Sequence, residues 1–278
     1  MSIIYEPRGK AREYSPLAAN FYSGCDHKCL YCYAPSIQFK SREAYSTVNP
    51  RANIIRLFEN DARKIAGNET QVLFNFMGDP YCLANEEHGI TRQCLEIALK
   101  HHLPIAILTK GGERCLADLD VFKRFGRHIK VGATLTFSNP EKSYEWENGA
   151  AFPENRIVAL EVLHKHGVKT WASFEPVIEP AESLEMIRKT LYCCDEYKIG
   201  KLNNYNKLDK DIDWTAFLEE AVSILRAADK EFYIKKDLRN AAPSIELTER
   251  EITADAHCVT PWKQHAGIPS VVDYRISV

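Results

Sequence analysis

The chain alternates between short runs rich in β-branched and aromatic residues and longer runs in which apolar residues return every three or four positions. Runs of the first kind predict strands, and several are almost continuously apolar, which is typical of parallel strands buried on both faces. The strand candidates are residues 17–22, 71–77, 104–109, 130–137, 169–175 and 197–202.

Runs of the second kind predict amphipathic helices between these strands. Apolar positions share one helical face over residues 54–65, 90–98, 157–163, 184–191 and 214–228. Pro153 and Gly167 bracket the third run, as the start and end of a helix would. About six βα units in series therefore predict a parallel sheet with right-handed crossovers.

The number of units bears on the fold, because a complete eight-unit barrel takes about 250 residues. Roughly the last 40 residues show no clear βα pattern. We therefore predict an α/β partial (β/α)6 barrel over residues 1–240, followed by an irregular C-terminal cap or tail over residues 241–278. An open doubly wound sheet is the alternative. In both folds the chemistry is expected at the carboxyl ends of the strands.

Composition narrows the class of protein further. With 45% hydrophobic and 27% charged residues in 278, the chain is typical of globular proteins, and its net charge of −2 lends no support to phosphate binding. Basic residues gather over 8–12 and 235–239, and we interpret both groups as solvated faces, with nucleic-acid contacts as the alternative. No apolar run reaches about 18 residues and no signal-peptide core is present, so we expect a cytoplasmic protein without membrane contact.

Nine cysteines are many for such a protein, and an odd number cannot all form disulfides. Cys25, Cys29 and Cys32 follow the first strand with the spacing C-x3-C-x2-C. Thiolates select iron–sulfur clusters, zinc or copper(I). Structural zinc requires four ligands, and no second pair completes such a site. A four-iron cluster held by three cysteines leaves one iron open to bind something else. Three unrelated buried or redox cysteines are the remaining alternative.

The pattern C-x3-C-x-Φ-C, with Tyr31 at the aromatic position Φ, resembles the radical S-adenosylmethionine superfamily. The resemblance covers roughly residues 15–205 and implies a partial barrel with a [4Fe–4S] cluster on the three cysteines. It also implies that S-adenosyl-L-methionine chelates the open iron and is cleaved to a 5′-deoxyadenosyl radical, which takes hydrogen from a substrate. Such enzymes receive an electron from a donor such as flavodoxin or ferredoxin.

Two strand ends resemble cofactor-binding positions of that superfamily. Gly78, Asp79 and Pro80 follow the second strand, where the superfamily has a turn that binds the amino group of the cofactor. Lys110 follows the third strand, where it could pair with the cofactor carboxylate. A plain strand-to-helix turn and a solvated lysine are the respective alternatives.

Polar side chains also alternate with apolar ones near three later strand ends. Thr134 and Thr136 share one face of the fourth strand, and Ser173 and Glu175 share one face of the fifth. If those faces line the barrel, their side chains could reach the cofactor or substrate, and a buried carboxylate such as Glu175 needs a partner. Asn203, with Asn204 and Tyr205, ends the sixth strand and suits contacts to adenine or substrate.

Within the superfamily the chain is similar to the spore photoproduct lyase-like group. The similarity rests on residues 20–25 and 32–34, on Thr109 and Lys110, and on residues 175–178. It implies a lyase of DNA repair, in which a cysteine near strand two returns hydrogen, and Cys82 is the candidate here. A buried, inert thiol is the alternative.

The function predicted from the sequence is therefore radical repair or modification of a nucleic-acid base. The same chemistry on a peptide or small metabolite is the first alternative, and a non-catalytic iron–sulfur redox protein is the second. Cys94 lies on the apolar face of a predicted helix, so we expect it in the core. The oligomeric state is left open.

Overall fold

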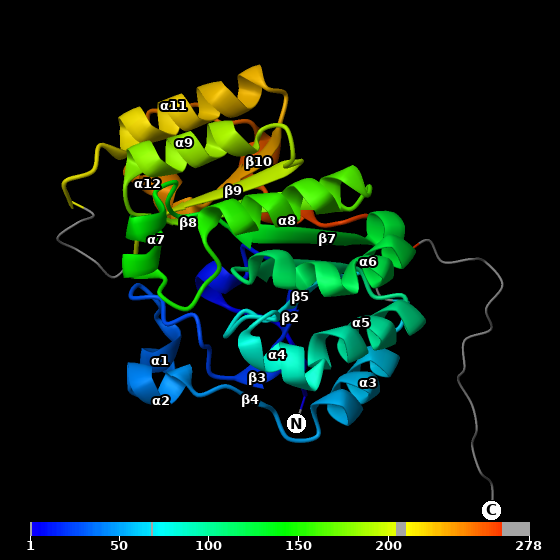
Figure 1. Ribbon diagram of the computed structural model, residues 1–278. Helices are drawn as coiled ribbons and strands as arrows, with labels where there is room; N and C mark the ends of the chain where they lie inside the picture. Colours follow the sequence, from blue (N-terminus) through cyan, green and yellow to red (C-terminus); the bar gives the residue numbers. More distant parts are fainter. Residues whose placement is uncertain (1, 68, 204–209, 263–278) are drawn as a thin grey trace, which may run out of the picture.

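The computed structural model describes residues 2–67, 69–203 and 210–262, so Asn204 and Tyr205 lie outside the described residues (Figure 1). An eight-stranded sheet runs through the centre in the order β1-β2-β5-β6-β7-β8-β9-β10. Its strands are β1 Ile4–Tyr5, β2 Leu17–Ala19, β5 Val72–Phe74, β6 Ile105–Thr109, β7 Ile129–Thr134, β8 Lys169–Val177, β9 Glu196–Lys201 and β10 Glu231–Ile234.

The order of the strands decides between the two predicted folds. Strands β2 to β10 of this sheet are parallel and follow one another in chain order, while β1 pairs antiparallel with β2 at the edge. A doubly wound sheet reverses its strand order near the middle, and this sheet does not. The partial-barrel prediction is therefore confirmed, and the doubly wound alternative is wrong.

Two details of the strand prediction are wrong. The candidate at 17–22 is broken: β2 ends at Ala19, and β3 Tyr22–Ser23 instead pairs antiparallel with β4 Asn49–Pro50 in a separate two-stranded ribbon. The strand β10 adds a seventh parallel strand to the six that were predicted. It was missed because its four residues lie between charged ones, which leaves too short an apolar run to recognise.

Helices cover the outside of the sheet (Figure 1). All five predicted helices are confirmed, and their bounds are α3 Ile54–Lys64, α5 Ile90–Lys100, α8 Pro153–Lys165, α9 Pro180–Thr190 and α11 Trp214–Ala227. The other α-helices described are short: α1 Ala34–Ile37, α2 Arg42–Ser46, α4 Leu83–His88, α6 Leu119–Phe125, α7 Pro140–Trp146, α12 Lys236–Ala241 and α13 Glu249–Ile252. No helix among the described residues is both long and apolar enough to cross a bilayer.

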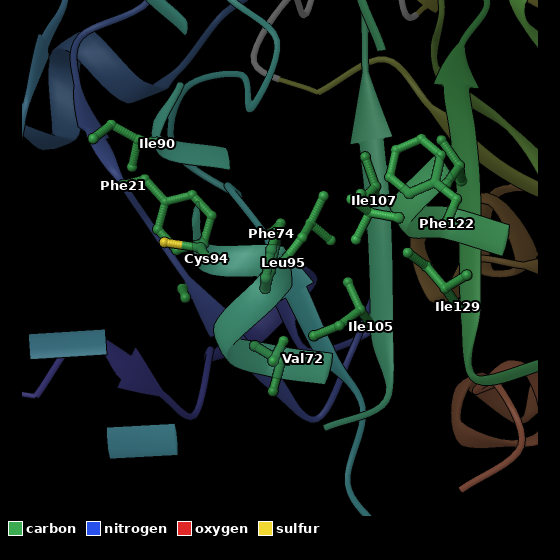
Figure 2. Close-up of a cluster of buried hydrophobic side chains, with 14 of the residues drawn as sticks. Phe21, Val72, Phe74, Ile90, Cys94, Leu95, Ile105, Ile107, Phe122 and Ile129 are labelled. Carbon is green, nitrogen blue, oxygen red and sulfur yellow. The ribbon is translucent and has the colours of Figure 1, made fainter. Parts of the chain in front are cut away.

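The outer face of the sheet packs against these helices through aliphatic and aromatic side chains. Figure 2 shows Phe74 and Ile107 of neighbouring strands beside Leu95 of α5 and Phe122 of α6. Cys94 is fully buried in this cluster, as predicted. Because alternate residues of each strand point outward, the intervening residues face the inside of the partial barrel.

The inner face of the sheet carries charged groups as well as Trp171. One of them, Lys235, corrects our interpretation of the basic residues as solvated. Lys235 is 2% exposed and pairs with Glu175 at 2.5 Å, so it is neither a solvated residue nor a phosphate contact. Arg12 pairs with Asp255 at 2.6 Å, and Lys10 pairs with Asp237. These three cations pair with carboxylates of the same chain, whereas Arg8, Lys10 and Lys236 are exposed, as expected for solvated residues.

Candidate active site

The cysteine loop begins at the end of β3, and its path depends on Gly24. This residue has a φ of 88°, and a Cβ there would lie 2.3 Å from the Thr47 carbonyl oxygen, so a side chain is excluded. The amide of Cys25 then donates to the Tyr45 carbonyl at 2.8 Å. The loop is thereby held against α2 and its flanking residues.

The three predicted ligands line one hollow. Cys25, Cys29 and Cys32 surround it together with residues of the loop and of the α1–α2 segment, and its volume is about 350 Å³. Burial raises the pKa of Cys25, and it raises the pKa of Cys29 to about 12 although the nearby Lys110 lowers it. Iron coordination would supply the positive charge that these buried thiols need in order to ionise.

The three sulfurs do not lie close enough together in this structure to share a single metal ion. Within the described residues, the three thiols do not form a group whose ligand atoms all lie within 4.8 Å of one another. A tetrahedral zinc ion with bonds of about 2.3 Å to sulfur would require such a group. A [4Fe–4S] cluster binds each cysteine through a different iron and holds the sulfurs further apart.

Arg42 of α2 holds the backbone of the cysteine loop between the second and third cysteines. Its guanidinium donates to the carbonyl oxygens of Cys29 at 2.8 Å and Cys32 at 3.4 Å, and also to that of Leu30. One planar group with several donors can satisfy three carbonyls that point the same way. The curvature of the loop between the second and third cysteines therefore depends on Arg42.

The end of α7 and the residues that follow it also hold the backbone of the cysteine loop. The amide of Leu30 donates to the Trp146 carbonyl at 2.8 Å, and the amide of Gly149 donates to the His27 carbonyl at 3.0 Å. Gly149 passes so close to the loop that a Cβ there would lie 2.0 Å from the Asp26 carbonyl oxygen. The cysteine loop is thus clasped between α2 and residues 146–149.

Glu147 lies at the centre of this clasp. Its buried carboxylate accepts hydrogen bonds from the hydroxyls of Tyr31 and of Thr136, the latter at 3.1 Å, and pairs with the buried Arg156 of α8 at 2.6 Å. Burial alone would raise the pKa of Glu147, but Arg156 and Lys110 outweigh it and the pKa is lowered. An ionised Glu147 therefore fixes the orientation of the Tyr31 ring.

The turn after β5 contains the predicted Gly78 and Asp79. Gly78 has a φ of 106°, and a Cβ there would approach the Gly24 carbonyl oxygen to 2.9 Å. The Asp79 carboxylate accepts from the Thr109 hydroxyl at 2.6 Å and from the Lys110 amide at 2.7 Å. It also lies 3.4 Å from Nδ1 of the buried His27. Asp79 therefore joins the ends of β5 and β6 to the cysteine loop.

His27 is held as a neutral imidazole. Burial lowers its pKa, Arg114 lowers it further, and Asp79 and Asp26 oppose this without reversing it. The guanidinium of Arg114 lies 3.1 Å from Nε2, which leaves Nδ1 to carry the proton toward Asp79. The histidine between the first two cysteines is thus a link between the loop and the sheet.

Lys110, which is half-buried, differs from the buried Arg156 of the site. Among the described residues its ammonium has no hydrogen-bond or ion-pair partner, and it lies 5.5 Å from the centre of the Tyr31 ring. Burial alone would lower its pKa, yet Cys29 and Glu147 outweigh that effect and the pKa is raised. A charged, half-buried ammonium without an ion-pair partner among the described residues is suited to receive an anionic group at the end of β6.

The remaining predicted residues fall into two places. Thr134, on the inner face at the end of β7, accepts through its carbonyl from Arg156 at 2.8 Å and so belongs to the region around the loop. Ser173 and Glu175 instead contact the hydroxyl of Tyr14, at 3.0 and 2.5 Å. Asn203 accepts from Lys10 at 2.6 Å. The chain itself therefore supplies the partner that Glu175 was expected to take from a ligand.

The other cysteines lie apart from the three ligands. Cys82 is 1% exposed in the outer hydrophobic core, and burial, with Asp79 and Asp26, raises its pKa to about 12. Cys94, Cys115, Cys193 and Cys194 are buried in the same or the neighbouring core cluster. Within the described residues, no second set of three cysteines forms a compact metal-binding group.

Four functional contacts were missed in the sequence: Arg42, His27, Glu147 and Arg156. Arg156 had a recognisable signal, because it lies four positions before Leu160 on the buried face of α8, where a charged residue needs a partner. The other three lie in loops or in the short helix α2, and no period in the sequence marks which way such side chains point.

Comparison with known families agrees with this geometry. The model of the radical SAM superfamily matches residues 19–192, which is more than half of the chain and includes the cysteine loop, both arms of its clasp and Lys110. The chain belongs to the radical SAM superfamily. Members of this superfamily use a [4Fe–4S] cluster and S-adenosylmethionine, so the resemblance in the cysteine loop is confirmed at the level of family and cofactors.

The chain also matches individual proteins. It is 29% identical over 170 residues to an uncharacterized protein of Methanocaldococcus jannaschii, covering 60% of this chain and 62% of that protein. It is 24% identical over 166 residues to an uncharacterized protein of Mycobacterium tuberculosis, covering 57% and 48%. The match thus spans about half to three fifths of these relatives.

Solved structures share the fold. SuiB of Streptococcus suis bound to S-adenosylmethionine has a TM-score of 0.62 at 15% identity, covering 84% of this chain and 53% of that one. Spore photoproduct lyase complexed with dinucleoside spore photoproduct also has a TM-score of 0.62, at 12% identity, covering 82% and 78%. Both likenesses concern the fold alone.

Proposed function

We propose that this enzyme binds a [4Fe–4S] cluster through Cys25, Cys29 and Cys32 and cleaves S-adenosylmethionine reductively. The observation that carries the proposal is the half-buried ammonium of Lys110, which lies near Cys29 and has no hydrogen-bond or ion-pair partner among the described residues. When bound, the cluster and cofactor supply one electron and a 5′-deoxyadenosyl radical that abstracts hydrogen from a substrate.

Different residues of the chain bind and orient different parts of the cofactor. Lys110 receives the cofactor carboxylate, and backbone groups of the turn at Gly78 receive its amino group, since the Asp79 carboxylate already accepts bonds from the chain. Tyr31, held by Glu147, presents its ring to the cofactor. Thr134 and Thr136 line the adjacent strand end, where they are within the same region as Arg156 and Glu147.

The inner face below these residues excludes water. Trp171 and Tyr14 fill it, with ring centres 6.2 Å apart, and the indole of Trp171 donates to the Ile107 carbonyl at 2.9 Å. A carbon radical requires an enclosed site of this kind, because water and exposed side chains would otherwise react with it.

The test is anaerobic reconstitution with iron and sulfide, followed by reduction with dithionite in the presence of S-adenosylmethionine. We expect 5′-deoxyadenosine from the wild type and none from Cys29→Ala, with Cys94→Ala as the matched control because that buried thiol lies in the core. Zinc in place of iron, or a cluster without cleavage in the wild type, would refute the proposal.

A non-catalytic iron–sulfur protein is separated from an enzyme by Lys110. In an enzyme, Lys110→Met should weaken binding of S-adenosylmethionine about 10- to 100-fold, since a charge-assisted contact contributes about 1.5–3 kcal/mol. The exposed Lys165→Met is the control. Equal affinity in Lys110→Met and wild type would favour the redox protein.

For the substrate, we propose a nucleic-acid base, handled by a lyase or modification reaction as in spore photoproduct lyase. The support is the similarity of residues 20–25, 32–34 and 175–178 to that group. The basic residues at 235–239 add none, because Lys235 is buried. Salt-dependent binding of a short thymine-containing oligonucleotide would support the proposal. Absence of binding at low salt would favour a peptide, such as the precursor peptide bound by SuiB, or a metabolite.

A further inference from the structure

One short segment beside the cysteines exposes an unusual amount of apolar surface. Within residues 30–39, Ile37 is 59% exposed and Phe39 is 98% exposed, and Leu30 and Tyr33 are also exposed. Helix α1, which holds Ile37, lies with α2 at the margin of the molecule, away from the sheet (Figure 1). We call Leu30, Ile37 and Phe39 the α1 patch. Several exposed apolar side chains on one short segment are typical of an interaction surface.

The backbone holds Phe39 in this exposed position. Phe39 has a φ of 53°, in the left-handed region that side chains other than glycine rarely adopt. Its amide donates to the Ser36 carbonyl at 3.2 Å, and the next amide, of Lys40, donates to the Pro35 carbonyl at 3.0 Å. A tight, hydrogen-bonded turn therefore displays a fully exposed aromatic ring at an energetic cost, which is common at functional surfaces.

The hollow that the three cysteines line meets the α1 patch at Leu30. Its lining consists of residues between Cys25 and Ser46, among them Lys28, Leu30 and Arg42. None of the strand-end residues that we assign to the cofactor, such as Lys110, lines it. A partner seated on the α1 patch would therefore reach the cysteines through this hollow and leave those strand-end residues uncovered.

The charge around the patch indicates the kind of partner. Between residues 28 and 43 the charged residues are Lys28, Lys40, Arg42 and Glu43, three cations against one carboxylate, in a chain whose net charge is −2. A second copy of the chain would bring the same positive segment to a two-fold contact and be repelled. An acidic protein with an apolar rim is complementary to it.

We propose that the α1 patch is the docking surface of a small acidic one-electron carrier protein of the flavodoxin type. The proposal rests on the proposed function, since a cluster at the cysteines must be reduced. In the complex the reduced flavin loses one electron and the [4Fe–4S]²⁺ cluster gains it to become [4Fe–4S]⁺, and no covalent bond forms or breaks. A carrier on the patch would lie next to the hollow that the three cysteines line.

The test compares two variants with matched controls. Ile37→Ser/Phe39→Asn removes the apolar groups, with asparagine chosen because it tolerates the left-handed backbone, and Lys40→Glu reverses one charge. The controls are Tyr144→Ser/Phe152→Asn, a stacked pair of exposed rings outside the α1 patch, and Lys165→Glu. Binding of oxidised flavodoxin to the reconstituted protein is measured by calorimetry at two salt concentrations.

We expect Ile37→Ser/Phe39→Asn to weaken flavodoxin binding about tenfold or more and Lys40→Glu to weaken it several-fold at low salt, with neither control doing so. Cleavage of S-adenosylmethionine driven by flavodoxin should fall in parallel, while cleavage driven by dithionite stays unchanged. Unaltered flavodoxin binding would overturn the docking proposal. So would loss of oligonucleotide binding in place of flavodoxin binding, which would assign the patch to a nucleic acid. Failure of dithionite-driven cleavage in the wild type would instead refute the proposed function.

Discussion

The two ends of the parallel sheet both bury charged side chains, but they use them differently. At the carboxyl end, the Glu147–Arg156 pair at 2.6 Å contacts the cysteine loop through Tyr31, and Lys110 beside it has no ion-pair partner among the described residues. At the amino end, Lys130 and Glu196 also pair at 2.6 Å. The charges at that end are satisfied by one another.

The amino end illustrates how a compact polar group can be structural. Glu196, Glu231 and His257 have ligand atoms within 4.8 Å of one another, which resembles a metal site. Lys169, however, lies 3.4 Å from Glu196 and 3.1 Å from Glu231, and Lys130 holds the other oxygen of Glu196. Buried charge alone therefore does not mark an active site, whereas a charge left without an ion-pair partner beside potential ligands, such as Lys110, indicates one.

The largest effect should come from variants that remove the buried ion pair at each end of the sheet. Glu147→Gln leaves Arg156 buried without its counter-ion and should lower the free energy of unfolding by about 3–5 kcal/mol. The double variant Glu147→Leu/Arg156→Met should recover most of that stability, because apolar replacement of a buried pair is often neutral. It should still cleave S-adenosylmethionine at least about tenfold more slowly than wild type, because Tyr31 loses its anchor.

The matched control at the other end is Lys130→Met/Glu196→Leu, which removes a pair of the same length and burial. It should keep the rate of cleavage. Denaturant titration and 5′-deoxyadenosine formation are measured for all variants. Equal loss of cleavage in both double variants would show that the buried pairs at the two ends do not differ in their importance for cleavage.

The next largest effect is expected at Arg42, which tests the contact between α2 and the cysteine loop. Arg42→Met removes the donors to the carbonyls of Cys29, Leu30 and Cys32 without changing a ligand. Supporting groups of this kind typically alter metal affinity or activity about 10- to 100-fold. We expect the reconstituted cluster to be lost to a chelator faster by that factor, followed by its visible absorbance, whereas the exposed Arg63→Met should match wild type.

These contacts also show what could be predicted from the sequence. The candidate cysteine ligands and Lys110 could be proposed from the sequence because their signal is local: a spacing, or a position directly after a strand. Glu147 and Lys235 were not, because their roles depend on which segments meet in space. Lys235 follows a four-residue strand that was missed, so its inward direction was hidden and it was grouped with solvated neighbours. Tertiary contacts of loops leave no period in the sequence.

A buried lysine at the inner face gives a pH-dependent effect. Lys198 is 0% exposed, and burial together with Lys130 and Lys235 lowers its pKa to about 7, although Glu196 opposes this. Between about pH 7 and pH 10 the unfolded chain therefore binds more protons at this site than the folded one, so its contribution to stability rises with pH and is lost as pH falls toward 7.

The variant Lys198→Met should lack that part of the rise. We expect the difference between the unfolding free energies of wild type and Lys198→Met to change by a few kcal/mol from pH 7 to pH 10 at most, and by much less than that below pH 7. The exposed Lys165→Met serves as the control, and denaturant midpoints at several pH values are the measurement. A difference that is constant from pH 7 to pH 10 would contradict the lowered pKa.

The smallest effect concerns Cys82, the cysteine predicted to return hydrogen to a substrate. It lies in the outer core, and its pKa of about 12 leaves it protonated at neutral pH. We therefore expect Cys82→Ser to change dithionite-driven cleavage of S-adenosylmethionine less than about twofold, because cleavage precedes any return of hydrogen and Cys82 lies outside the hollow of the three ligands. Alkylation of the native protein before reconstitution, read by mass spectrometry, should modify the partly exposed Cys32 well before Cys82. Rapid alkylation of Cys82 would instead show that this thiol becomes accessible to the solvent, as a hydrogen donor to a bound substrate must be. Cys82 would then be a functional residue and not a structural one.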